Sequence, residues 1–163
     1  MKIIITILLI FINNLIAFSQ TKTETQDWIK EKIEIYAYSN DAENFGHEYS
    51  VTFNEYFMFI KTSYFSNYDD PAPIVILYTI PVKEMNSIIF EEKLNTTWLI
   101  ISTKDNKKSI YSTDGKNNNA KYTNDLELIL YKSVNDSDMK NRFVKAFKHL
   151  VKLYGGSVVD EKF

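Results

Sequence analysis

From residue 49 to residue 131 the chain has the patterns of β-strands, in which apolar residues either alternate with polar ones or form short apolar runs. Tyr49, Val51 and Phe53 alternate with polar residues, which predicts a strand with one buried face. Asn54 and Glu55 then form a predicted tight turn. The further predicted strands are 56–60, 74–80, 86–92, 96–103, 109–112 and 126–131. We therefore expect about seven short strands within 47–132, and short turns between them favour antiparallel pairing.

The polar stretches between these segments are predicted as loops. They comprise 39–46, the proline-containing segment 68–73, and a stretch that begins at Asp114 and Gly115 and includes Asn117, Asn118 and Asn119.

The segment from 24 to 38 has the period of an amphipathic helix. Thr23 and Gln26 have the spacing of a capping box, which favours a helix start. The residues predicted to share its apolar face are Trp28, Ile29, Ile33, Tyr36 and Ala37.

A second amphipathic helix is predicted over 137–154. Asp136, Ser137 and Asp138 provide capping and acidic residues for its N-terminus. Gly155 and Gly156 favour its end, and 157–163 are expected to be a flexible tail. The predicted apolar stripe consists of Met139, Phe143, Val144, Ala146, Phe147, Leu150, Val151 and Tyr154.

The first 19 residues have the order of a cleavable export signal. Lys2 precedes an uncharged apolar run at 3–12, and Ala17 and Ser19 supply small side chains before a predicted cleavage site. A membrane-spanning helix needs roughly 20 apolar residues, and Asn13 and Asn14 interrupt this run. We expect cleavage after Ser19, a periplasmic or extracellular location, and no stable membrane anchor afterwards. Because the chain has no cysteine, lipid attachment to an N-terminal cysteine is excluded.

These elements predict a single α+β domain over 20–156. An N-terminal helix precedes antiparallel strands that form a rolled sheet or barrel, and the C-terminal helix buries its apolar stripe against the sheet. The chain's 24 aromatic residues, 11 Tyr, 11 Phe and 2 Trp, favour one large aromatic core.

At this point the chain resembles the pleckstrin-homology-like (PH-like) family, in which seven antiparallel strands precede one capping helix. The resemblance covers about residues 45–154 and rests on three segments. These are Tyr78–Ile88, which is similar to an I-P-containing passage of the family, Trp98–Thr103 at the fifth strand, and Phe143–Leu150 in the helix. The whole chain also resembles small exported proteins of Bacteroidetes-type bacteria.

The resemblance implies the fold and argues against the family's best-known ligand. Phosphoinositide-binding members have a basic loop between their first two strands, whereas Asn54 and Glu55 make this loop short and acidic. Nucleic acid is equally disfavoured, because the net charge is −2 and Arg142 is the only arginine.

No residue pattern in the chain indicates catalysis, a cofactor or a metal site. There is no G-x-S-x-G motif and no glycine-rich phosphate loop. His47 and His149 are interpreted as ordinary strand and helix residues. The pair Asp69–Asp70 lacks calcium-loop spacing, and Asp136 and Asp138 are interpreted as helix-capping residues. Glu91–Glu92 is not singled out as a catalytic pair. Lys104, Lys107 and Lys108 are interpreted as a solvated turn, with a weak anion-binding surface as the alternative.

Three hypotheses on function follow. The first is a non-enzymatic binding or interaction module for a protein partner, whose contact patch would include Tyr64, Phe65 and Tyr68. The second is a carrier of a small apolar ligand, held between the sheet and the closing helix in a cavity lined by aromatic residues. The third is a hydrolase with an unrecognised site.

Overall fold

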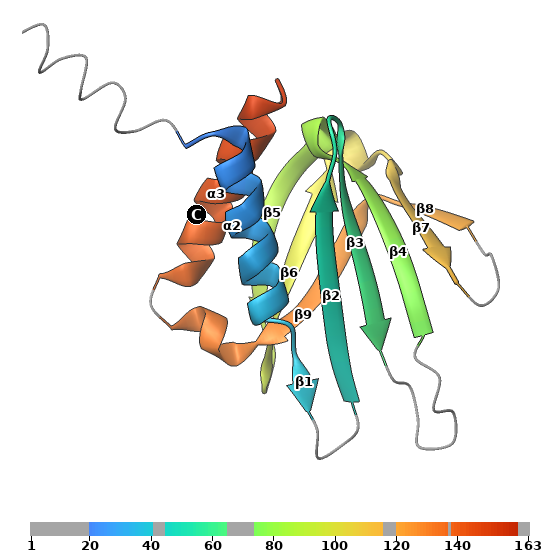
Figure 1. Cartoon of the computed structure of the whole chain (residues 1–163), viewed down its shortest axis with the longest axis vertical. Helices are drawn as coiled ribbons and strands as arrows, with labels where there is room; N and C mark the ends of the chain where they lie inside the picture. Colours follow the sequence, from blue (N-terminus) through green and yellow to red (C-terminus); the bar gives the residue numbers. More distant parts are fainter. Residues whose placement is uncertain (1–19, 41–44, 65–73, 116–119, 137, 160–163) are drawn as a thin grey trace, which may run out of the picture.

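A computed structural model describes residues 20–40, 45–64, 74–115, 120–136 and 138–159. Within these residues the protein is α+β, with two helices packed side by side along one side of two antiparallel sheets (Figure 1). The α+β class and the predicted helices at both ends of the strand region are confirmed. The seven predicted strands are all present.

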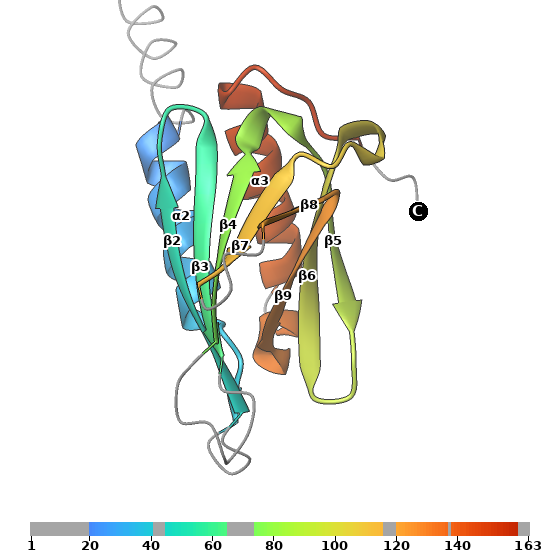
Figure 2. The same ribbon diagram turned by 90° about the vertical axis from the view of Figure 1, so that its right-hand side faces the viewer.

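The larger sheet has six strands in the order β1-β2-β3-β4-β7-β8. These are β1 (Ser39–Asn40), β2 (Phe45–Phe53), β3 (Phe57–Tyr64), β4 (Ile74–Pro81), β7 (Ile110–Asp114) and β8 (Ala120–Thr123). The smaller sheet has the order β5-β6-β9. It contains β5 (Met85–Glu92), β6 (Thr96–Thr103) and β9 (Asp125–Tyr131). Figure 2 shows the two sheets as separate layers.

Three bent chain segments carry the backbone from one sheet to the other. The 3₁₀ turn η2 (Val82–Glu84) joins β4 to β5, and the turn η3 (Lys104–Asn106) lies between β6 and β7. Asn124 alone separates β8 from β9, and its carbonyl accepts a hydrogen bond from Thr103 N at 2.9 Å. Three short connections therefore join the two sheets.

The two sheets do not close into a barrel, so the barrel prediction is wrong. At one edge of the six-stranded sheet, the short strand β1 pairs only with the start of β2, and helix α2 (Lys22–Ile35) lies beside β2. The Glu34 Oε1 atom of this helix accepts a hydrogen bond from Val51 N of β2 at 2.9 Å. A carboxylate thus takes the place of a neighbouring strand along this edge.

Helix α2 begins two residues before its predicted start. The capping box is formed by Thr21 and Glu24 rather than by Thr23 and Gln26. Thr21 N donates to Glu24 Oε2 at 2.7 Å, and Glu24 N donates to Thr21 Oγ1 at 3.2 Å. These hydrogen bonds lower the pKa of the Glu24 carboxyl.

The same helix ends at Ile35 and not at 38, because the next residues become extended and pair with β9. Tyr131 N donates to Tyr36 O at 2.8 Å, and Tyr38 N donates to Ile129 O at 3.2 Å. The backbone groups of these residues thus form hydrogen bonds with β9 in place of the hydrogen bonds that a further helical turn would provide.

The closing helix α3 spans Met139–Leu153, and its predicted side-chain capping by Asp136 and Asp138 is wrong. Its N-cap is Asp138 in the left-handed conformation, with φ 58° and no side-chain hydrogen bond to the helix backbone. The Asp138 carboxylate instead accepts a hydrogen bond from the Asn141 side chain. The helix ends as predicted, with Gly155 at φ 74°.

The remaining differences are two strands in stretches that have no apolar alternation. Residues 39–46 were predicted as a loop, yet β1 pairs there with the start of β2. Strand β8 follows the predicted polar loop and pairs with β7. Strand β8 is an edge strand, and its residues 120–122 are exposed. It therefore has no alternation of buried apolar and exposed polar residues from which the strand could be predicted.

The core lies where α2 and α3 meet the facing sheets. Phe143 and Phe147 of α3 are fully buried, with Ile29 and Ile33 of α2 beside them in one continuous apolar cluster. Tyr154 ties the two helices to the β2–β3 turn. Its hydroxyl accepts from Gln26 Nε2 at 2.7 Å and donates to Asn54 O at 2.8 Å. The predicted apolar stripe of the closing helix is confirmed by this packing.

Candidate functional site

The predicted aromatic contact patch lies mostly outside the described residues. Tyr64 is the last residue of β3, and its backbone pairs with His47 and Ile74. Phe65 and Tyr68 fall outside the described ranges. The patch therefore stays a prediction.

The two histidines lie on different elements. His47 is a half-buried residue of β2 whose ring stacks on Tyr49 at a centroid distance of 6.0 Å, and burial lowers its pKa. His149 lies on α3, where its Nε2 is 3.0 Å from Gln20 O. Neither residue belongs to a group of three or more His, Asp or Glu side chains that could hold a metal ion within the described part of the chain.

Of the carboxylate pairs considered from the sequence, the structure describes Glu91 and Glu92, and these two do not converge. Asp69 and Asp70 are outside the described residues. Glu91 and Glu92 are adjacent in β5, so their side chains point to opposite faces of the sheet. Glu92 Oε1 binds Lys140 Nζ of α3 at 2.6 Å, and this contact lowers the pKa of the Glu92 carboxyl.

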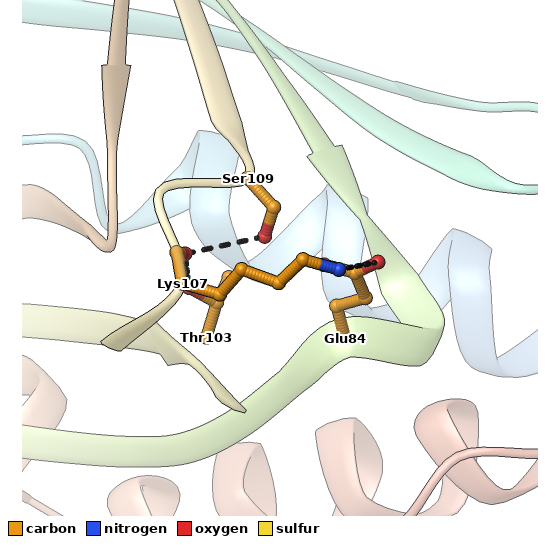
Figure 3. Close-up of polar contacts among 4 residues, drawn as sticks. All are labelled: Glu84, Thr103, Lys107 and Ser109. Carbon is orange, nitrogen blue, oxygen red and sulfur yellow. Dashed lines mark hydrogen bonds and ion pairs between the residues drawn. The ribbon is translucent and has the colours of Figure 1, made fainter. Parts of the chain in front are cut away.

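The predicted lysine turn makes contacts within the protein (Figure 3). Lys107 Nζ lies 3.4 Å from Glu84 Oε1 of η2, and Thr103 and Ser109 donate their hydroxyls to the Lys107 carbonyl. Lys104 Nζ lies 3.4 Å from Ser157 Oγ. These contacts connect the bends between the sheets, which favours a structural role for the turn over an anion-binding surface.

A groove of about 440 Å³ lies between β5 and α3. Its walls combine an apolar strand face with one side of the helix, and the segment after α3 closes one part of it. The lining residues are Ser87, Ile88, Ile89, Phe90, Lys140, Asn141, Val144, Lys148, Val158 and Val159. Two of these are lysines, and Lys140 is ion-paired with Glu92 of β5, so the groove is apolar with charged residues at its rim.

The segment after α3 runs along the start of β5. Val159 N donates to Asn86 O at 3.0 Å. Three residues earlier, a Cβ on Gly156 would lie 2.6 Å from Lys83 O. Between these two contacts, the tail and the segment that leads into β5 each advance by three residues in the same direction. The tail therefore runs parallel to β5. Val158 between them packs against the core. Within the segment 157–163 that is expected to be a flexible tail, residues 157–159 contact β5 through this hydrogen bond, and Val158 is partly buried.

We expect Gly156→Ala to destabilise the protein by about 1–3 kcal/mol, as overpacking does. The new methyl group would meet Lys83 O at 2.6 Å and Val151 Cγ1 at 2.7 Å, and the first of these is backbone that cannot turn away. Chemical denaturation measures the change. Gly115→Ala is the matched control, because its Cβ would lie 3.5 Å from the nearest atom, an ordinary contact. Equal stability of the two variants would contradict the close packing of the tail.

A second hollow, of about 540 Å³, opens between the two sheets. Ile74, Ile76 and Tyr78 of β4 form one wall, and β9 forms another with Leu126 and Glu127. Tyr49 reaches from β2 to the β9 backbone. Its hydroxyl accepts from Ile129 N at 2.8 Å and donates to Ile129 O at 3.2 Å. This cleft differs in charge from the groove, since three carboxylates and one lysine line it: Asp114, Asp125, Glu127 and Lys121.

Comparison with protein-family models, with curated proteins and with solved structures gave no match. Among the helices of the described residues, none is both long enough and apolar enough to cross a membrane.

The sequence did not predict which residues line the groove. The apolar positions of β5 and α3 were predicted, but Lys140 and Lys148 carried no signal, because lysines on a helix usually face solvent. The tail contributes Val158 and Val159, and two valines after a helix end predict no particular contact. Only the packing of α3 against β5 brings these residues together.

Proposed function

We propose that this protein is an exported, non-catalytic binding module whose ligand lies in the groove between β5 and α3. The observation that carries the proposal is the groove itself, which combines an apolar floor with two lysines at its rim, one of them ion-paired with Glu92. Its volume of about 440 Å³ is within the range of roughly 300–1,000 Å³ that is typical of ligand sites.

The charge and polarity of the groove indicate the ligand chemistry. Ile89, Phe90 and Val144 offer apolar contact, and Lys148 is a cation at the same site. The second lysine, Lys140, is ion-paired with Glu92. An apolar ligand that carries an anionic group can use both features, because burial of apolar surface provides affinity and charge complementarity provides specificity.

The position of the groove connects two of the sequence-based hypotheses. The carrier hypothesis places its ligand between the sheet and the closing helix. The hollow found there is a groove at the surface, and Phe90 is the one aromatic residue among its described lining residues. These features favour a partner that is bound at the surface over a ligand enclosed in an aromatic cavity.

A PH-like relationship and export through residues 1–19 form part of this proposal. The packing of a C-terminal amphipathic helix against antiparallel strands supports the relationship. The order of charged, apolar and small residues at the N-terminus supports export.

The proposal predicts that the dye 1-anilinonaphthalene-8-sulfonate, an apolar fluorophore with one sulfonate, binds the native protein in this groove. We expect saturable fluorescence enhancement with the wild type and at least fivefold weaker binding to Lys148→Glu, because the substitution places a negative charge beside the sulfonate. Lys121→Glu is the matched control, since Lys121 lines the cleft between the sheets instead.

Thermal melting of all three proteins checks that they are folded, because this dye also binds partly unfolded chains. Absence of binding to the wild type, or equal loss of binding in the two variants, would contradict the proposed site.

A further inference from the structure

The cleft between the two sheets is a second hollow, and it shares no lining residue with the groove. Its volume is about 540 Å³. Ile74, Ile76 and Tyr78 of β4 lie on the same face of the larger sheet as Ile80, because side chains alternate along a strand. At Ile80 this face is buried in the core, and at the other three residues it lines the cleft. The apolar wall of the cleft is thus a continuation of the core.

A buried hydroxyl group faces the cleft from β7. Ser112 is 8% exposed and lies on the same face of β7 as the core residue Ile110. Among the described residues, none forms a hydrogen bond with the Ser112 side chain. Buried polar groups in proteins normally have a hydrogen-bond partner, either in the protein or in a bound molecule. The Ser112 hydroxyl is therefore available to a ligand in the cleft.

The facing strand β9 directs backbone groups into the cleft. Residues of an antiparallel strand point their N–H and C=O groups alternately to one neighbour and to the other. Ile129 points away from β6, because its N–H donates to the Tyr49 hydroxyl at 2.8 Å. Glu127 lies two residues earlier and points to the same side, where no other described residue bonds to its N–H or C=O. The cleft therefore offers a backbone donor and a backbone acceptor.

The rim of the cleft has an excess of negative charge. Asp125 and Glu127 are exposed lining residues, and neither belongs to an ion pair within the part of the chain that the structure describes. Asp125 Oδ2 accepts a hydrogen bond from the neutral side chain of Asn124 at 2.8 Å, which leaves the negative charge in place. Lys121 is the one lysine among the described lining residues. The charge of the rim therefore favours a cationic ligand over an anionic one.

These features match an organic cation with an apolar body better than a metal ion. Within the described ranges, no group of three or more acidic or histidine side chains could hold a metal. A primary ammonium group needs only one or two carboxylates, with which it forms charge-assisted hydrogen bonds. A ring or alkyl chain attached to it can contact Ile76 and Tyr78.

We propose that the cleft is a second binding site, which takes a small amine. The apolar body of the amine lies against β4, and its ammonium group lies at Asp125 and Glu127. This site goes beyond the proposed function, because its residues are separate from the groove and its ligand has the opposite charge. Burial of the apolar body provides affinity, and the carboxylates provide selectivity for the cation.

Two fluorescent probes with the same apolar body test the site on the full-length chain. Dansylcadaverine joins a dansyl group to a pentyl chain that ends in a primary amine, and N-pentyldansylamide lacks this amine. Fluorescence titration at neutral pH should show saturable binding of dansylcadaverine and about tenfold weaker binding of N-pentyldansylamide, because the neutral probe cannot pair with the carboxylates.

A double variant, Asp125→Asn with Glu127→Gln, removes the charge of the rim and keeps its shape. We expect it to bind dansylcadaverine about tenfold more weakly and N-pentyldansylamide as the wild type does. The matched control is Glu48→Gln with Glu55→Gln, which changes the net charge equally at two exposed residues outside the cleft.

Two further variants locate the probe. Ile76→Trp fills the cleft from β4 and should weaken binding of both probes. Lys148→Glu changes the groove and should leave dansylcadaverine binding unchanged. Thermal melting shows which variants are folded, and the double variant decides alone if Ile76→Trp does not fold.

The inference is overturned if dansylcadaverine does not bind, if both probes bind equally, or if the two double variants bind dansylcadaverine equally. Tighter binding to Lys148→Glu would place the probe in the groove and would overturn the inference as well. Normal binding to a folded Ile76→Trp would have the same meaning. The anilinonaphthalene dye tests the groove separately, because the substitutions in the cleft leave the residues of the groove unchanged.

Discussion

Phe143→Ala should lower the free energy of unfolding by about 3–5 kcal/mol, the range for truncating a fully buried phenylalanine. Phe143 is fully buried at the point where both helices meet the smaller sheet. Its ring lies 5.3 Å from that of Trp28 and 5.8 Å from that of Phe90, and Phe147 stacks beside it at 6.5 Å. The substitution leaves a cavity that three separate elements would have to fill.

Leu153→Ala on the same helix is the control for this substitution. Leu153 is 41% exposed, so its truncation removes little buried surface. Urea denaturation of both variants measures the difference in stability. A loss below 1 kcal/mol for Phe143→Ala would contradict the packing of α2, α3 and β5 around this ring.

Tyr49→Phe should cost about 1–3 kcal/mol, because it removes the buried hydroxyl that satisfies a backbone N–H. The hydroxyl accepts from Ile129 N at 2.8 Å and donates to Ile129 O at 3.2 Å, which links β2 to β9 across the gap between the sheets. The matched control is Tyr122→Phe, since Tyr122 is 61% exposed. Equal stability of the two variants in urea would show that this link contributes nothing.

The same tyrosine makes stability depend on alkaline pH. Burial raises the pKa of Tyr49 above its usual value in the folded protein, whereas the unfolded chain should titrate near pH 10. Above pH 10 the unfolded state therefore loses a proton that the folded state retains, so stability falls as pH rises. Tyr49→Phe removes this contribution. Its stability should decline less steeply than that of the wild type between pH 9.5 and 11, and parallel profiles would contradict the assignment.

Much of this fold follows from local residue patterns. The period-two alternation at Tyr49, Val51 and Phe53 predicts β2, and the apolar stripe that includes Phe143 and Phe147 predicts α3. Such patterns arise because one face of each element is buried. They do not depend on which other element covers that face. The element types were therefore predictable from the sequence.

What the sequence did not predict depends on contacts between distant segments. Barrel closure depends on whether the edges of the two sheets meet, and Glu34 bonding to Val51 gives no signal in a hydrophobic pattern. The capping box was shifted by two residues, because Thr21 and Glu24 fit the same spacing rule as Thr23 and Gln26. The groove depends on the tail returning to β5, a contact between residues more than 70 positions apart in the chain.

The bends at η2, η3 and Asn124 also bear on how the groove can respond to a ligand. Because β4 continues into β5, β6 into β7 and β8 into β9, the two layers cannot separate as independent rigid bodies. A hinge-like opening would have to bend all three connections at once. The groove wall formed by β5 is accordingly preorganised, and a ligand would gain access by displacing residues 157–159, a small rearrangement that leaves the two sheets in place.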